Sequence, residues 1–136
     1  MMKKIAVGVA MTGSALLISS QAPAHHSFAM FDLQKNITLE GMVVEWQWTN
    51  PHSWLQMKAK DASGKEVEWS LEGTSPNNLS RRGWTRTSLK PGDKASVQIH
   101  PLKDGSPGGS IVTAWVNGHL IGESGPDTDA RPSPAR

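Results

Sequence analysis

The stretch "ITLEGMVVEWQW", Ile37–Trp48, decides the fold because its alternation of inward and outward positions changes phase once. Up to Val43 the predicted inward positions are odd-numbered, whereas from Val44 onward they are even-numbered. Successive side chains of a strand point to opposite faces, so this shift indicates a β-bulge, and Gly41 allows the bend. The pattern predicts one coiled strand that passes from one sheet layer to another and ends before Pro51.

Four more strands and one short helix are predicted along the chain. Apolar residues at every second position predict three strands, with inward faces formed by Leu55, Met57 and Ala59, by Val67, Trp69 and Leu71, and by Ala95, Val97 and Ile99. A fifth strand over Ser110–Val116 ends at the turn Asn117-Gly118. Between the third and fourth strands, Ser75 as N-cap, Pro76 in the first turn and Gly83 beyond the end predict one or two helical turns.

This order of elements predicts an all-β fold with one short helix. We expect a small five-stranded Greek-key barrel of the oligomer-binding (OB) kind, and the alternative is a small open β-sandwich. The domain is predicted over residues 25–121. Residues 122–136 are polar and rich in proline and glycine, so we expect a disordered tail there.

Residues 1–24 predict a cleaved secretory signal. Lys3 and Lys4 precede an apolar run over residues 5–18, and Ala22-Pro23-Ala24 forms a small-x-small cleavage site before His25. The apolar run is shorter than the ~20 residues that a membrane-spanning helix needs, so we expect no integral membrane anchor. The chain contains no cysteine, which excludes disulfides and a lipid-modified cysteine. The predicted product is a soluble periplasmic protein.

Length and charge limit the partners. Cleavage would remove 24 of the 136 residues and leave 112, enough for one domain. Lys3 and Lys4 would leave with the signal, so the 14 basic residues of the full chain fall to 12 and equal the 12 acidic residues. Binding driven by phosphate needs a cationic surplus, so we do not expect a nucleic-acid partner. We expect a monomer that binds a small ligand or another periplasmic protein.

The predicted mature chain begins with His25 and His26, which suggests a copper site. The α-amine and the imidazole of a terminal histidine can chelate one copper ion, and a further imidazole would complete a T-shaped set of nitrogens, which copper(II) favours. Candidates for the additional metal ligand are His52 in "TNPHSW" and His100 in "IHPLKDG", each at a predicted strand end beside a proline. The alternative is that these histidines are structural or incidental, as we expect for His119.

Tryptophans and arginines suggest a second kind of site. Six tryptophans accompany two phenylalanines and no tyrosine, a balance that fits either a stacking groove or a filled barrel core. Trp69 and Trp115 share faces with aliphatic residues, so we expect them in the core. The arginines of "RRGWTRT" could bind an anionic group. The alternative interpretation is that they form a solvated helix face. The candidate ligand-binding residues are Trp46, Trp48, Trp54, Trp84, Arg82 and Arg86.

The sequence contains no constellation that indicates catalysis. The glutamates at strand positions form no pair with a spacing typical of acid/base chemistry, and no serine lies in a nucleophile elbow. We therefore predict no catalytic residues and a protein that is not an enzyme.

Five motifs in order carry a resemblance to a known family: "AHHSFAMFD", "LEGMVVEWQWTNPHSWL", "EWSLEG", "SPNNLSRRGWTRTSLKPGD" and "HPLKDGSPGG". The chain resembles a family of short exported Gram-negative bacterial proteins that is known only as a domain of unknown function. The resemblance implies a signal peptide and a small β-rich domain. It also implies that family members share His25, His26, the segment Asn50–His52 and the pair Gly83-Trp84.

Two functional hypotheses follow. The first is a non-enzymatic periplasmic binding module that holds copper through His25 and His26 with His52 or His100. The second is a metal-free ligand-binding or protein-interaction module that uses the tryptophans and arginines. "LEGMVVEW" and "LKPGDKASVQIH" also resemble strands of exported bacterial OB-fold proteins that bind small ligands or cations, which supports a binding role by analogy of fold.

Overall fold

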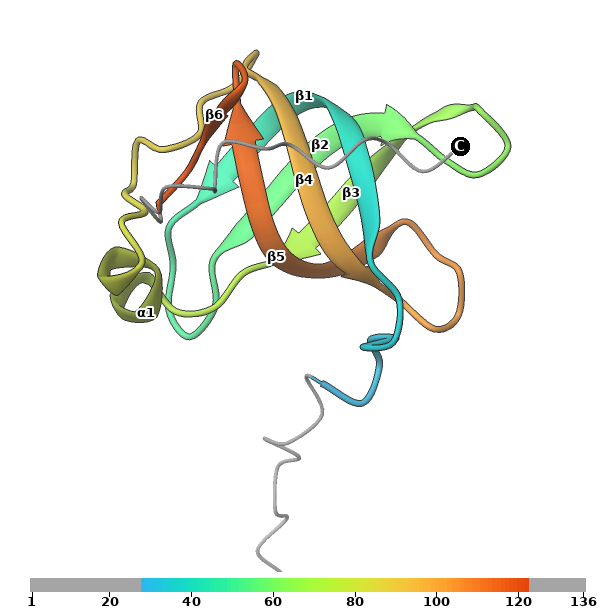
Figure 1. The fold of residues 1–136 in the computed structure, drawn as a ribbon, viewed down its shortest axis with the longest axis horizontal. Helices are drawn as coiled ribbons and strands as arrows, with labels where there is room; N and C mark the ends of the chain where they lie inside the picture. Colours follow the sequence, from blue (N-terminus) through green and yellow to red (C-terminus); the bar gives the residue numbers. More distant parts are fainter. Residues whose placement is uncertain (1–27, 123–136) are drawn as a thin grey trace, which may run out of the picture.

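The structure, a computed structural model, describes residues 28–122. The predicted signal peptide, His25, His26 and the tail from residue 123 lie outside this range. The described chain folds into six strands and one helix (Figure 1). The elements are β1 (Ile37–Gln47), β2 (Trp54–Lys60), β3 (Glu66–Glu72), α1 (Pro76–Arg81), β4 (Lys94–Pro101), β5 (Gly108–Val116) and β6 (His119–Leu120).

The strands close into a barrel in the order that defines an OB fold. β1 pairs antiparallel with both β2 and β4, β2 pairs with β3, and β4 pairs with β5. A short parallel pairing of Ser70–Glu72 on β3 with Gly108–Ser110 on β5 closes the ring, and α1 lies between β3 and β4 in the chain. The predicted five-stranded Greek-key barrel is confirmed, and the strands do not form an open sandwich.

The long first strand bends where its sequence pattern changes phase. Val43 pairs with Met57 and Glu45 with Gln56, so Val44 is the extra residue of a bulge. At Gly41 the backbone of β2 passes so close that a Cβ atom would lie 1.8 Å from the carbonyl oxygen of Lys58. The bulge and the glycine together allow β1 to pair with β2 on one side and β4 on the other.

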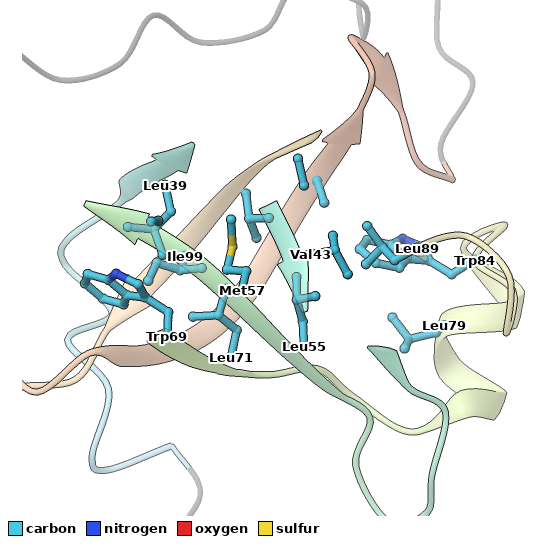
Figure 2. Packing of buried hydrophobic residues seen from close by; sticks show 14 residues of the cluster. Leu39, Val43, Leu55, Met57, Trp69, Leu71, Leu79, Trp84, Leu89 and Ile99 are labelled. Carbon is cyan, nitrogen blue, oxygen red and sulfur yellow. The ribbon is translucent and has the colours of Figure 1, made fainter. Parts of the chain in front are cut away.

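The barrel interior is filled by the predicted inward faces. Leu55, Met57, Leu71, Val97 and Ile99 are fully buried. Figure 2 shows the buried cluster with Trp69 near one end and Leu79, Leu89 and Trp84 at the other, next to α1. Each fully buried large aliphatic side chain contributes about 1.5–3 kcal/mol relative to exposure. The core therefore continues from the barrel to the underside of the helix.

The helix is positioned by the capping residues that the sequence predicted. The Ser75 hydroxyl accepts a hydrogen bond from the Asn78 N–H at 3.3 Å, and Pro76 is the first helical residue. Gly83, just beyond the end, has a φ angle of 82°, which favours glycine. Leu79 is the buried residue of this short helix, so one side chain anchors it to the core.

The C-terminal strands differ from the prediction in two places. β5 begins at Gly108 rather than at Ser110, because residues of the expected glycine-rich loop pair with β3 and β4. A Cβ atom on Gly109 would lie 2.6 Å from the carbonyl oxygen of His100, so this glycine permits close pairing rather than breaking the strand. The Asn117-Gly118 turn is present, with φ angles of 49° and 84°, and it leads into the unpredicted strand β6.

We predict that Gly41→Ala destabilises the protein by about 3 kcal/mol or more, because the added methyl group would overlap the β2 backbone. Urea unfolding followed by tryptophan fluorescence measures this change. Val44→Ala is the control, since Val44 is 38% exposed and should cost less than about 1 kcal/mol. Equal stability of the two variants would contradict this account of the bend.

Candidate functional site

The N-terminal lead, residues 28–36, is fastened to the barrel before β1 begins. Phe31 forms an isolated bridge with Leu102 and is only 4% exposed. The Asp32 N–H donates to the Pro101 carbonyl at 2.8 Å, and the Lys103 N–H donates to the Met30 carbonyl at 3.0 Å. The lead is therefore held against the end of β4 and the segment that joins β4 to β5.

A hollow of about 220 Å³ lies between this lead, the β1–β2 loop, the end of β3, α1 and β5. We call it the His52 hollow. Its floor is apolar and includes Trp84 and Leu79 of the core, which are each 2% exposed. Its polar lining comes from distant parts of the chain: His52, Glu72, Thr74, Arg82 and Ser110. Phe28, the first residue described, also lines it.

Glu72 orients the imidazole of His52 in this hollow. Nδ1 of His52 contacts Oε1 of Glu72, and their side chains are 37% and 11% exposed. An ionised carboxylate only accepts hydrogen bonds, so Nδ1 carries the proton and Nε2 of a neutral imidazole keeps its lone pair. Within residues 28–122, His52 makes no other side-chain hydrogen bond. This is the protonation pattern of a histidine that is ready to bind a metal ion.

The pairing of His52 with Glu72 follows from strand register. Trp54 of β2 lies opposite Glu72 of β3, and His52 precedes Trp54 by two residues. The loop is fixed further by hydrogen bonds from the Ser53 N–H to the Thr74 carbonyl and from the Gly73 N–H to the Ser53 carbonyl. Sequence reasoning missed Glu72, because a separation of 20 residues carries no pairing signal until the hairpin register is known.

The other candidate, His100, lies on β4 and is held by the lead. Its Nδ1 is 2.8 Å from the carbonyl oxygen of Lys35, an acceptor, so Nδ1 donates here too. Ser110 of β5 pairs with His100 of β4 on one side and with Glu72 of β3 on the other. Strand β5 therefore lies between His100 and Glu72. No group of three potential metal ligands is found among residues 28–122. His119 is exposed on β6.

The candidate tryptophans do not share one face. Trp46 packs with Trp48 and Trp84 at ring-centroid distances of 5.9 and 5.7 Å, and its Nε1–H donates to the Thr85 carbonyl at 3.2 Å. Trp54 lies opposite Gln47 and Glu72, on the side of the sheet away from the buried Leu55. It lines a separate hollow of about 210 Å³ beneath the lead. A single groove built from all the tryptophans is therefore absent from the described chain.

The two candidate arginines differ in position. Arg82 lines the His52 hollow, and its Nη2 donates to the carbonyl of Val112 at 3.0 Å. Val112 is the residue that β5 inserts as a bulge, between Ile111 opposite Ile99 and Thr113 opposite Gln98. Arg86 is exposed in the loop after α1. The predicted arginine cluster is thus divided between a hollow and the surface.

Two carboxylates outside the hollow have shifted acidity. The Ser63 hydroxyl and neighbouring backbone N–H groups hold the pKa of Asp61 below its ordinary value. Ser106 does the same through its hydroxyl and N–H for the pKa of Asp104. Both aspartates lie in the loops of the β2–β3 and β4–β5 hairpins, so these shifts reflect turn geometry rather than the candidate site.

The fold and the hollow define a small OB-barrel protein with a polar-lined, apolar-floored hollow beside its N-terminal lead. The chain belongs to the family of unknown function DUF6152, which matches residues 14–111 and confirms the resemblance seen in the motifs. A crystal structure of the mitochondrial single-stranded DNA-binding protein Rim1 from S. cerevisiae matches with a TM-score of 0.43 and 8% identity, over 61% of this chain and 94% of that chain. No curated protein matches the sequence. Residues 28–122 contain no helix with the length and apolar character to cross a membrane.

We predict that Phe31→Ala loosens the lead, because Phe31 is the buried residue of its bridge to the β4–β5 segment. Hydrogen exchange at the Lys103 amide, which donates to Met30, should accelerate at least tenfold. Phe28→Ala is the matched control, since Phe28 is 68% exposed and should leave the Lys103 rate unchanged. An unchanged rate in Phe31→Ala would show that the lead is held by other contacts.

Proposed function

We propose that the protein is an exported, non-enzymatic binding module that holds one copper(II) ion at the His52 hollow. The ligands are the α-amine and imidazole of His25 and Nε2 of His52. The observation that carries this proposal is that Phe28 and His52 line the same hollow, although 24 residues separate them. The lead therefore supports placing the mature N-terminus beside the histidine at the β1–β2 loop.

The length of the chain permits this arrangement. His25 precedes Phe28 by three residues, and an extended chain spans about 3.3–3.6 Å per residue, so its α-amine lies within roughly 10 Å of Phe28. That reach is comparable with the width of a small hollow. His26 is one residue nearer to Phe28 and is the neighbouring donor, as the histidine pair in the sequence suggested.

The contact between His52 and Glu72 supports a ligand role for His52. Histidines that bind metals usually donate their other ring N–H to a carboxylate or a carbonyl, which fixes the ring and strengthens the donor nitrogen. Glu72 supplies that carboxylate in a nearly buried position. His100 has the equivalent contact with a carbonyl, but Phe28 lines the hollow of His52, which favours His52 as the third ligand.

The metal-free alternative, a tryptophan and arginine surface, has less support. Trp84 is 2% exposed, and Trp46 is engaged by two rings and by the Thr85 carbonyl, so neither presents an open face for stacking. A nucleic-acid partner is not favoured either. On the outer face of β2 and β3, Lys58 lies opposite Glu68 and Lys60 opposite Glu66, which leaves no cationic surplus there.

We predict that copper(II) binds with one ion per chain when the N-terminus is His25, and that His52→Ala raises the dissociation constant at least tenfold. An additional N-terminal alanine should have a similar effect, because it removes the α-amine from the chelate. Isothermal titration with a competing chelator measures the affinity, and electron paramagnetic resonance counts the nitrogen ligands. His119→Ala is the control, since His119 is exposed on β6. Equal affinity in all four proteins would refute the site.

We also predict that Glu72→Gln weakens copper binding by about 10–100-fold without removing a metal ligand, because the amide orients His52 less well than the carboxylate. The same titration measures this loss. Glu68→Gln, an outward change on the same strand, should retain the affinity of the unmodified protein. A normal copper affinity in Glu72→Gln would mean that Glu72 has only a structural role.

A further inference from the structure

We propose that residues 123–136 fold back along the barrel and dock on the outer face of β4 and β5, against Trp115 and Ser96. This contact lies outside the His52 hollow, so it is independent of the proposed copper site. The proposal rests on another hollow, of about 470 Å³, which is lined by two buried polar side chains without hydrogen-bond partners in the part of the chain that the structure describes. We call it the Trp115 hollow.

Strand register places the Trp115 hollow on the outside of the barrel. Ser96 of β4 lies opposite Glu40 of β1 on one side and opposite Trp115 of β5 on the other, and directly paired side chains point to the same face. Glu40 is exposed, so this row faces outward. Trp115 is accordingly not a member of the cluster that fills the barrel, although the sequence predicted it in the core. Figure 1 shows β1, β4 and β5 side by side along this face.

Two polar atoms of this row are buried without partners. Trp115 and Ser96 are each 4% exposed, and the described chain offers no hydrogen-bond partner to the indole Nε1–H or to the hydroxyl. Among residues 28–122 the other such atoms, on Ser53 and Trp69, are not strand neighbours, whereas Trp115 and Ser96 are directly paired. Buried polar groups in folded proteins are nearly always hydrogen-bonded. A segment of backbone complements this pair, since its carbonyls accept from the indole and its N–H groups donate to the serine oxygen.

The segment after β6 begins close to this face. Leu120 of β6 lies opposite Trp115, and Gly122, the last residue described, follows two residues later. An extended chain spans about 3.3–3.6 Å per residue, so the 14 residues 123–136 reach roughly 46–50 Å. The face from β5 to β1 is two strand spacings wide, which is about 10 Å. The length of the segment is therefore sufficient to cross it.

The composition of residues 123–136 suits an extended, docked segment. Its three prolines favour the polyproline II conformation, in which backbone carbonyls make no internal hydrogen bonds. Proline-rich segments in this conformation also dock on aromatic side chains. The segment has too few apolar residues to form a core of its own, so the barrel supplies the surface that orders it.

The charges of the segment match those of the hollow. Glu40 and Lys94 line the Trp115 hollow at exposed positions, so a purely anionic or purely cationic partner would meet a like charge. Residues 123–136 carry both signs, with Asp127 and Asp129 followed by Arg131. These mixed charges favour the segment over a simple ion as the occupant.

The test places a nitroxide spin label on a Ser133→Cys variant and reads the indole N–H signals of the six tryptophans in ¹⁵N-labelled protein. The chain contains no cysteine, so the label attaches at one position. Docking should remove most of the Trp115 signal and leave most of the Trp84 signal. A freely tethered segment would act on Trp84 first, because a Cβ atom on Gly122 would lie 2.9 Å from Cδ1 of Trp84. Equal or greater loss of the Trp84 signal would overturn the proposal.

A label on the barrel itself is the positional control. Ser63 and Trp69 line one hollow beside the β2–β3 hairpin, so a label on Ser63→Cys should broaden Trp69 and spare Trp115. A second copy of the chain is tested by mixing spin-labelled Ser133→Cys protein without ¹⁵N with ¹⁵N-labelled protein that has no spin label. The Trp115 signal should not change in this mixture. Broadening there would assign the face to a second copy and overturn the proposal.

Hydrogen exchange at the Trp115 indole tests the contact with Ser96. Exchange should accelerate about fivefold in Ser96→Ala, because one hydrogen bond that holds the segment is lost. The Trp69 indole, at the other end of the barrel from α1, reports any change in global stability. Ser110→Ala is the matched control, since Ser110 lies on β5 outside the Trp115 hollow. An unchanged Trp115 exchange rate in Ser96→Ala would overturn the assignment of the segment to this face.

Discussion

The close approach of two backbones at Gly41 is the contact on which the rest of this structure depends. A side chain at this position would collide with the carbonyl of Lys58, so only glycine lets β1 lie flat against β2 there. Three residues later, Val44 enters as a bulge, and β1 turns toward β4. Without that bend β1 could not pair with both β2 and β4, and β3 and β5 would not pair to close the barrel.

Closure of the barrel creates the candidate site. The parallel pairing of β3 and β5 places Glu72 beside Ser110, and the β2–β3 register places Glu72 below the loop that carries His52. The bulge at Val112 then supplies the carbonyl that holds Arg82. Glu72, Ser110 and Arg82 are therefore positioned by pairing between strands or by a bulge, and backbone hydrogen bonds between Ser53, Gly73 and Thr74 hold the loop of His52 beside them.

The N-terminal lead covers part of the barrel near the β4–β5 segment. OB folds commonly bind ligands on the face of the second and third strands and between the β1–β2 and β4–β5 loops. Here the lead crosses toward the β4–β5 segment and is bonded to Pro101 and Lys103, while the outer faces of β2 and β3 place lysine opposite glutamate. The His52 hollow lies beside α1, and Phe28 of the lead is one of its lining residues.

The sequence by itself determined the bend in β1, the inward faces of β2, β3 and β4, the caps of α1 and the turn at Asn117-Gly118, whereas Val44, predicted to point inward, is 38% exposed because it is the extra residue of the bulge. These features depend on residues close together in the sequence, through the alternation of side chains along a strand, the backbone conformations that glycine can adopt, and local capping hydrogen bonds. It also singled out His52 as a metal ligand and Arg82 and Trp84 as ligand-binding residues, and so assigned them to two different sites. Only the tertiary structure decided that they share one hollow, that Glu72 orients His52, and that Trp54 lies apart from Trp46, because strand register and barrel closure join residues whose separation in sequence carries no pairing signal.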